Sequence, residues 1–286
     1  EQDPGLSLCI SIINNHSIPP MSVSIEDRFN FDLHGFLILR GALTVEECGA
    51  YIEELIRLEE QDYEDKFLEK YTDGNPGRGT KESANGNGVR LNGLPRLSDV
   101  FDPLIAHPGV VPFLEEFIGL PQLINTWSIS KFEGCTEGGW HRGVPTSDYS
   151  FRNGDIRSRM LNVIFFLTDN GPEDGCVVAI PASHKSSFDL SWQDYPGLDM
   201  PGAIPVTGKA GDVFMFSEAT IHNGLPKTTE GRRSNLYFNY VHSHYNVMTR
   251  EPRNCHHFYL PPDVRERFDE DQKKMTEWME FVKWDH

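Results

Sequence analysis

The second half of the chain alternates short runs of β-forming residues with turns, and this alternation constrains the fold more than any other feature. Gly, Pro and Asp separate the runs, and short strands with such regular punctuation are typical of a β-sandwich or barrel. The runs lie at 123–132, 138–143, 159–168, 176–181, 204–208, 212–217 and 232–245. The pattern predicts a β core over about residues 123–245.

Helical patterns flank this β region on both sides. Thr44 and Glu47 form a capping box, in which a hydroxyl and a carboxylate satisfy the first free N–H groups of a helix. Apolar residues then recur at helical spacing, so we expect this helix to run to about Lys70. Residues 108–118 and 262–284 carry the other helical patterns. The sequence therefore predicts a mainly β protein with flanking helices.

Two further segments precede the β region. Residues 34–40 (HGFLILR) are predicted to form a buried strand. Residues 72–98 are rich in Gly, Asn, Pro and charged residues, which predicts a long loop. Arg90 and Asn92 lie near the end of this loop, and we expect them to close over a substrate, since lids exclude water from reactive sites.

The length of 286 residues suits one domain with a substantial core. We expect a weakly ordered extension over residues 1–20 and a single domain over residues 21–286. The apolar patch at 6–13 follows Glu1 and Asp3, whereas a signal peptide begins with positive charge. The protein is therefore expected to be cytoplasmic.

Charge and cysteine usage exclude several kinds of partner. The formal net charge is −17, which argues against nucleic acid and anionic membranes because phosphate contacts need clustered Lys and Arg. No apolar run reaches the length of a membrane span. Free thiols in a reducing compartment are expected, because the cysteines are odd in number and widely spaced. They are Cys9, Cys48, Cys135, Cys176 and Cys255.

Two histidines and an arginine in the β region carry the candidate chemistry. His141 lies in the run GGWHRG, and His222 follows a predicted strand and precedes Asn223-Gly224, where a side chain can point into a barrel mouth. Arg233 lies eleven residues after His222 within an apolar strand. A buried guanidinium needs a partner, and its planar donors suit a carboxylate ligand. An internal salt bridge remains the alternative.

Several further segments match a known family. The sequence resembles the phytanoyl-CoA dioxygenase family of iron- and 2-oxoglutarate-dependent oxygenases over most of its length, and the segment Pro-x-Ser-His-Lys is the most specific match. The matching segments are His34-Gly35-Phe36, Leu104-Ile105-Ala106-His107-Pro108, Gly175-Cys176, Pro181-Ala182-Ser183-His184-Lys185, Gly211-Asp212 and His222-Asn223-Gly224.

The resemblance implies a double-stranded β-helix, that is, a jelly-roll core like that of the cupins. It also implies Fe(II), 2-oxoglutarate and O₂ as cofactor and cosubstrates, and a small molecule as substrate. His141 and His222 would bind the iron. Arg233 would hold the distal carboxylate of 2-oxoglutarate, with Arg232 as its alternate. Asn162 would hydrogen-bond the cosubstrate or serve as an ordinary buried amide.

The sequence departs from the family pattern at Gly143. Hydroxylating members carry His-x-Asp, which adds a carboxylate ligand to the two imidazoles, whereas this chain reads His141-Arg142-Gly143. The interpretation we prefer resembles the 2-oxoglutarate-dependent halogenases, in which chloride takes the place of the carboxylate. The second is a hydroxylase, with water, Asp148 or Glu218 at the third position. The third is a degenerate site in a binding module.

Overall fold

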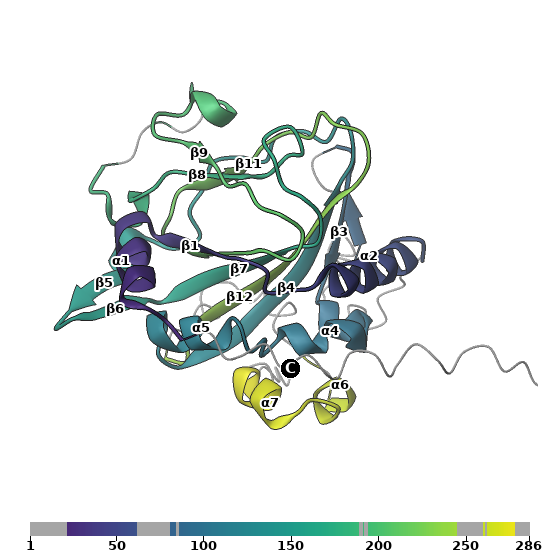
Figure 1. Cartoon of the computed structure of the whole chain (residues 1–286), viewed down its shortest axis with the longest axis horizontal. Coiled ribbons are helices and arrows are strands. Elements are labelled where there is room, and N and C mark those ends of the chain that lie inside the picture. Colours follow the sequence, from purple (N-terminus) through teal and green to yellow (C-terminus); the bar gives the residue numbers. More distant parts are fainter. Residues whose placement is uncertain are drawn as a thin grey trace, which may run out of the picture.

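The computed structural model describes residues 22–61, 81–83, 86–188, 191, 194–244, 260 and 262–277. Two sheets face each other, with helices on the outer face of the larger one (Figure 1). The larger sheet has seven strands in the order β1-β10-β7-β12-β4-β3-β2, and the smaller has the order β11-β8-β9. A separate hairpin joins β5 and β6. The described chain is therefore mainly β with flanking helices, as predicted.

The strands are β1 (Phe36–Leu39), β2 (Lys81–Ser83), β3 (Gly88–Asn92), β4 (Pro121–Lys131), β5 (Tyr149–Arg152), β6 (Asp155–Ser158), β7 (Met160–Phe166), β8 (Val177–Ala179), β9 (Ile204–Pro205), β10 (Val213–Ser217), β11 (His222–Gly224) and β12 (Arg233–His242). The α-helices are α1 (Ile25–His34), α2 (Val45–Glu59), α4 (Leu94–Leu97), α5 (Val111–Phe117), α6 (Pro262–Glu266) and α7 (Glu270–Met275). The 3₁₀ helices are η2 (Asp99–Leu104), η3 (Thr146–Asp148), η4 (Ser183–Lys185) and η6 (Gly197–Asp199).

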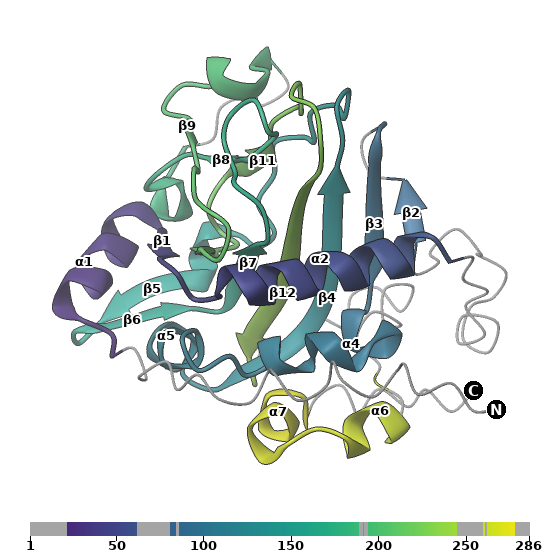
Figure 2. The ribbon, with the colours of Figure 1, turned by 45° about the vertical axis from the view of Figure 1, so that its right-hand side comes forward.

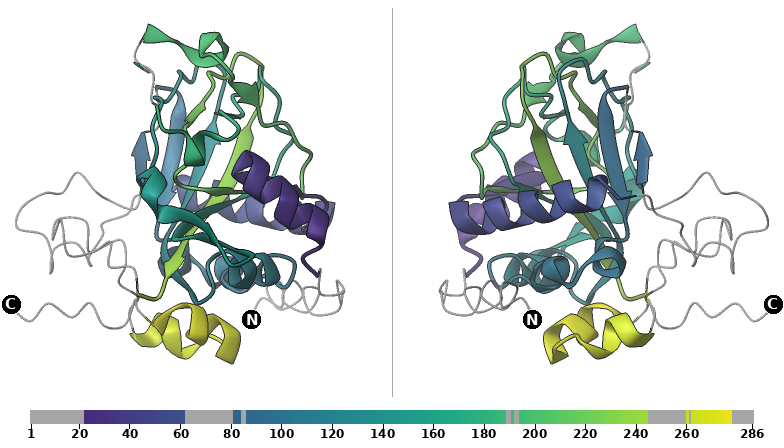
Figure 3. Two further views of the ribbon diagram at one scale, coloured as in Figure 1. Left: turned by 90° about the vertical axis from the view of Figure 1, so that its left-hand side faces the viewer. Right: turned by 90° about the vertical axis from the view of Figure 1, so that its right-hand side faces the viewer.

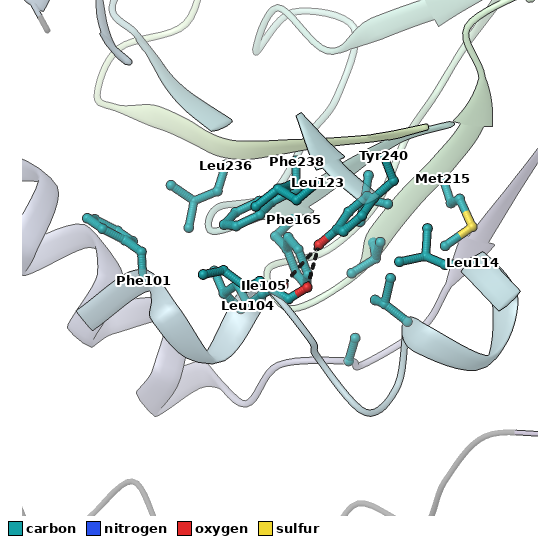
Figure 4. Close-up of a cluster of buried hydrophobic side chains, with 14 of the residues drawn as sticks. Phe101, Leu104, Ile105, Leu114, Leu123, Phe165, Met215, Leu236, Phe238 and Tyr240 are labelled. Atoms are coloured by element: carbon teal, nitrogen blue, oxygen red, sulfur yellow. Dashed lines mark hydrogen bonds between the residues drawn. The ribbon is translucent and has the colours of Figure 1, made fainter. Parts of the chain in front are cut away.

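The main core lies between the helices and the outer face of the large sheet. Helix α2 crosses this face (Figure 2), and its buried side chains join those of β7, β10 and β12 in one cluster. Figure 4 shows side chains of η2 and α5 meeting the sheet residues in this core. Helices α6 and α7 lie at the end of the molecule opposite to β9 (Figure 3). The helices thus cover one face and leave the other free to form a barrel with the smaller sheet.

A second apolar cluster fills the space between the two sheets. Ile164 and Phe166 of β7 and Phe214 and Phe216 of β10 contact residues of β8 on the smaller sheet. Successive strand side chains point to opposite faces, so the same strands supply both the outer core and this barrel interior. Near-continuous apolar runs in β7 and β10 therefore reflect burial on both sides.

One hydrogen bond anchors the helical layer to the sheet. The Tyr240 hydroxyl donates to the carbonyl oxygen of Ile105 at 2.9 Å in a fully buried setting (Figure 4). Tyr240→Phe should lower the free energy of unfolding by about 1–2 kcal/mol, because it leaves a buried carbonyl without its donor. Urea unfolding measures this. Tyr51→Phe is the control, since Tyr51 stacks on Phe101 in the same core and its hydroxyl donates to no described carbonyl. Equal midpoints for both variants would contradict the prediction.

The structure corrects several predicted boundaries. The first predicted helix ends at Glu59 rather than near Lys70, since the chain turns at Glu60; residues 62–80 lie outside the described chain. The predicted loop at 72–98 contains β3 and α4, and β3 pairs with β4. The predicted helix at 108–118 begins only at Val111, after a turn on His107.

Other differences concern elements that the sequence pattern concealed. The segment 138–143 forms no strand and makes only an isolated bridge, since its glycines offer no side chains for a sheet face. Helix α1 and the β5–β6 hairpin were not predicted. The closing helical region is two short helices, and its Trp278 and Phe281 lie outside the described residues, as does the extension over residues 1–20.

Two predictions about the whole chain can be compared with the described residues. Cys48, Cys135 and Cys176 are buried free thiols, as expected; Cys9 and Cys255 fall outside the described residues. Within the described residues, no helix combines the length and apolarity that crossing a membrane requires.

Candidate active site at the facing histidines

His141 and His222 lie directly opposite each other, with His222 buried and His141 exposed to solvent. They form an antiparallel bridge in which each backbone N–H donates to the other's carbonyl oxygen, at 3.1 and 3.0 Å. Their ring centroids are 4.2 Å apart and the rings are inclined by 55°. Two imidazoles bound at right angles to one metal through bonds of about 2.1 Å have centres roughly 4.5 Å apart. Residues 81 positions apart in sequence thus reach the spacing that one ion requires.

The ring nitrogens of both histidines are oriented in the same way. Nδ1 of His141 lies 2.7 Å from the carbonyl oxygen of Gly139, and Nδ1 of His222 lies 2.9 Å from that of Thr220. A carbonyl only accepts, so each Nδ1 carries the proton and each Nε2 keeps its lone pair for a metal. Burial, with the nearby His141, lowers the pKa of His222 to about 3. His222 is therefore neutral at physiological pH, which is the metal-binding form.

The Pro-x-Ser-His segment braces the residues beside both histidines. The Ser183 hydroxyl accepts a hydrogen bond from the backbone N–H of Ile221 at 2.8 Å. The backbone carbonyl oxygen of Ser183 accepts one from the Arg142 guanidinium at 3.3 Å. Residues 142 and 221 each adjoin one histidine. The segment therefore fixes the separation of the two imidazoles from outside the metal site.

A carboxylate fills the space beside Gly143. A Cβ built on Gly143 would lie 2.3 Å from Oε2 of Glu218 and 3.1 Å from its Cδ. Burial raises the pKa of Glu218, although His141, the Asn162 amide and the Gly143 N–H oppose the rise. The sequence suggested that His222 ends the strand now seen as β10, and this prediction is wrong. A turn that begins at Glu218 separates it from that strand, and His222 begins β11.

Asp148, the other acidic candidate, occupies a different position. It lies in η3 and is buried, and its carboxylate is 3.7 Å from the Arg159 guanidinium. It is therefore paired with an arginine, whereas Glu218 adjoins Gly143.

Two buried cations face each other across β12 and β4. Arg233 is paired in register with Lys131, and both side chains are 2% exposed. Arg233 donates to the carbonyl oxygen of Gly175 at 2.5 Å, and Lys131 donates to that of Leu225 at 2.6 Å. Neither forms an ion pair with a carboxylate among the described residues. Buried cations without a counter-ion predict an anionic ligand.

The adjacent arginine has a different role. Arg232 binds Glu59 through both terminal nitrogens, at 2.7 and 3.0 Å, on the helix-covered side of the sheet. The alternation of side chains along β12 separates the two guanidiniums. Arg233 is therefore the arginine that faces the barrel interior, and Arg232 anchors α2.

The segment that begins at His222 leads to the cation pair. Leu225, whose carbonyl binds Lys131, follows His222 by three residues, or about 10 Å in an extended chain. A five-carbon keto diacid bound at the histidines by its keto acid end can reach the cations with its other carboxylate. Lys131 was missed by sequence reasoning; its position two residues after the inward-facing Ile129 was the available signal.

A row of amides crosses the inner face of the large sheet. Asn162 of β7 pairs in register with Asn239 of β12, and Asn239 with Asn125 of β4. The side-chain oxygens of all three are buried without a hydrogen-bond partner. Unpaired buried polar atoms are costly and need an explanation such as a bound ligand. Asn162 thus belongs to a polar surface beside Glu218.

Arg90 and Asn92 lie on β3 rather than on a lid. The Arg90 Nε donates to Asn92 at 2.8 Å, and its guanidinium lies 4.9 Å from the centre of the Trp127 ring. Trp127 in turn stacks on Tyr237 with centroids 5.0 Å apart. Both residues belong to a strand that is paired within the large sheet, so their positions do not support the prediction that they close over a substrate.

Comparisons with known proteins agree with this geometry. The family model described as phytanoyl-CoA dioxygenase matches residues 31–235. The ectoine dioxygenase of Stutzerimonas stutzeri is 23% identical over 273 residues, covering 87% of this chain and 85% of that protein. The ectoine dioxygenase of Nocardia farcinica is 23% identical, covering 75% and 76%.

Solved structures share the fold. HygX from Streptomyces hygroscopicus, with nickel and 2-oxoglutarate bound, superposes with a TM-score of 0.65 at 20% identity, covering 81% of this chain and 94% of HygX. The same protein with nickel, 2-oxoglutarate and hygromycin B superposes with a TM-score of 0.63 at 22% identity, covering 78% and 88%. The predicted jelly-roll core is thereby confirmed.

The imidazoles lie at metal-binding spacing with each Nδ1 held by a carbonyl, and the paired cations suit a dicarboxylate, so the residues fit iron and 2-oxoglutarate. The family match covers more than half of the chain. The chain belongs to the phytanoyl-CoA dioxygenase family and is a non-haem Fe(II)- and 2-oxoglutarate-dependent oxidoreductase.

Proposed function

We propose that this enzyme hydroxylates an unactivated C–H bond of a small polar molecule. The observation that carries the proposal is the pair of histidines with both Nδ1 atoms held by carbonyls and both Nε2 atoms free. When bound, iron and 2-oxoglutarate supply O₂ activation. In the overall reaction one oxygen atom enters the substrate and the other enters succinate, with release of CO₂.

The protein's own residues bind and orient the reactants. Arg233 and Lys131 hold the distal carboxylate of 2-oxoglutarate at the end of the barrel. The apolar cluster between the sheets excludes water around the cosubstrate, which strengthens these charge interactions. The match to an enzyme family and the facing pair of histidines favour an active enzyme over an inactive binding module.

The polar nature of the substrate is inferred from the row of amides. Asn162, Asn239 and Asn125 offer buried oxygens without donors on the wall beside the histidines. A substrate with hydroxyl, amino or amidinium donors satisfies them, whereas a hydrocarbon chain leaves them unpaired. Ectoine and hygromycin B, named for the relatives above, are the first compounds to screen.

Chlorination is the second candidate, because Gly143 provides no carboxylate of its own. Hydroxylation is preferred because the Glu218 carboxylate already occupies the space beside Gly143. A chloride placed there would meet that carboxylate in a buried setting, where like charges repel strongly.

Product mass distinguishes the two candidates. Turnover with 2-oxoglutarate and O₂ in chloride, and separately in bromide, should give a product heavier by one oxygen atom in both buffers. Labelling from ¹⁸O₂ should appear in that product. A halogen isotope pattern that changes between the two buffers would instead establish halogenation, and the absence of succinate formation with every compound would count against both candidates.

The Lys131 ammonium predicts a pH dependence of cosubstrate affinity. Burial, followed by the charge of Arg233, lowers the pKa of Lys131 to about 8. Below this pH Lys131 is charged and attracts the carboxylate, whereas above it the charge is lost. The dissociation constant for 2-oxoglutarate should therefore rise as pH increases beyond about 8. Calorimetric titration under anaerobic conditions measures this, and Lys131→Met should bind more weakly and show no such rise. A rise retained in Lys131→Met would assign it to another group.

A further inference from the structure

Glu218 and Gly143 occupy one place in the site from two different segments. Standard bond lengths put each carboxylate oxygen of an aspartate about 2.4 Å from its own Cβ. Oε2 of Glu218 lies 2.3 Å from the position that a Cβ at residue 143 would take. The Glu218 oxygen is thus as far from this point as the carboxylate oxygen of an aspartate at position 143 would be. Glycine at position 143 leaves space for the carboxylate of Glu218, which comes from the neighbouring segment.

The backbone fixes this arrangement. The Gly143 N–H donates to the Glu218 carbonyl oxygen at 2.8 Å, and the His141–His222 bridge lies in the same ribbon. Segments 141–144 and 218–222 therefore run side by side in opposite directions. A residue at position 218 faces position 143 across the ribbon, so its side chain can replace the one missing there.

The Glu218 carboxylate has no cationic side chain as a partner. It is 4% exposed, and it forms no ion pair with Lys or Arg among the described residues. The groups next to it are the Asn162 amide, the Gly143 N–H and His141. A buried carboxylate is stabilised by protonation or by a compensating charge. A metal ion between the two imidazoles would supply that charge.

We propose that Glu218 provides the carboxylate ligand that position 143 lacks, giving two histidines and a glutamate from across the ribbon. This inference rests on the proposed function, since it concerns the same iron site. Among the described residues, no three His, Cys, Asp or Glu side chains already stand at metal-binding separations. The proposal thus requires the Glu218 side chain to turn toward the ion from its present position beside the Asn162 amide.

Cobalt(II) is the probe for this ligand set, because its visible spectrum reports coordination without turnover. Wild-type protein should bind Co(II) under anaerobic conditions. Glu218→Gln should weaken binding by about 100-fold or more and alter the spectrum, since changes outside the ligand set already cost about 10–100-fold. Asp148→Asn, which removes another buried carboxylate, is the matched control and should bind as the wild type does.

A carboxylate swap tests the spatial equivalence. Gly143→Asp alone should lower Co(II) affinity, because the new side chain collides with Glu218. Gly143→Asp combined with Glu218→Ala should restore Co(II) affinity to within about tenfold of the wild type, because the new aspartate then provides the carboxylate without colliding with Glu218. The effects of the two substitutions are therefore expected to be non-additive. Circular dichroism of each variant establishes that it is folded.

The wild-type structure with Co(II) bound provides a measurement independent of any variant. A Glu218 oxygen should lie about 2.0–2.2 Å from the metal. If Glu218→Gln binds Co(II) unchanged, or if the metal in that structure is held by His141 and His222 with Glu218 remote, the inference is wrong while the proposed function stands. If the wild type binds neither Co(II) nor Fe(II), both are wrong.

Discussion

His222→Ala should abolish tight iron binding and reduce turnover by more than about 1,000-fold. Changes in groups that only support a ligand already cost about 10–100-fold in metal affinity or activity, and His222 is itself one of the two facing imidazoles. Its Nδ1 is held by the Thr220 carbonyl, so Nε2 is the nitrogen left for the metal, and alanine removes it. Anaerobic Fe(II) titration and succinate formation measure the two effects.

His242→Ala is the matched control for this experiment. His242 lies at the end of β12 and stacks on His244 with centroids 5.2 Å apart. Its removal should leave iron affinity unchanged. Iron binding of wild-type strength in His222→Ala, or a similar loss in both variants, would show that the facing histidines are not the metal site.

Arg233→Ala should raise the dissociation constant of 2-oxoglutarate by about 30-fold or more. Truncating one partner of a buried, hydrogen-bonded charge pair costs about 2–5 kcal/mol, and every 1.4 kcal/mol is about tenfold in affinity. Arg233 is 2% exposed and faces the interior, so the carboxylate loses its principal donor there. Calorimetric titration of the metal-loaded protein under anaerobic conditions gives the value.

The neighbouring arginine supplies the control for this measurement. Arg232→Ala removes an equal charge one residue away but breaks the contact with Glu59 on the opposite face. It should lower the melting temperature, because the contact with Glu59 is lost. The affinity for 2-oxoglutarate should stay within about threefold of the wild type, because Arg232 shares no partner with the proposed cosubstrate site. An equal loss of affinity in both variants would mean that a general change of charge, rather than a bound guanidinium, is responsible.

The fold and the site could be predicted from the sequence where the signal is local. Regular β runs and turn residues predicted most of the barrel strands, and the resemblance to the family pointed to His141, His222 and Arg233, whose roles stay predictions. The register of β12 then placed Arg233 inside the barrel and Arg232 outside, a distinction that needs only the alternation of side chains. The helix boundaries were less accurate, because apolar residues continue in the sequence past Glu59, where α2 ends in a turn.

What the sequence could not show depends on contacts between distant segments. Glu218 was one of two acidic candidates for the third position, and only the ribbon that pairs residues 141–144 with 218–222 separates it from Asp148. Lys131 was not recognised, because its role follows from facing Arg233 on the next strand. The preference for halogenation arose from reading Gly143 as an open position. The structure places a carboxylate beside it, so halogenation stays an untested prediction that we now rank second.

Absorption spectroscopy of the anaerobic protein tests the iron and 2-oxoglutarate site most directly. Adding 2-oxoglutarate to the Fe(II)-loaded enzyme should produce a weak visible charge-transfer band that saturates at one equivalent. The band should be lost in His222→Ala and should require much higher 2-oxoglutarate in Arg233→Ala. A folded wild-type protein that gives no band with saturating iron and 2-oxoglutarate would contradict the assignment of His141, His222 and Arg233 to a single catalytic centre.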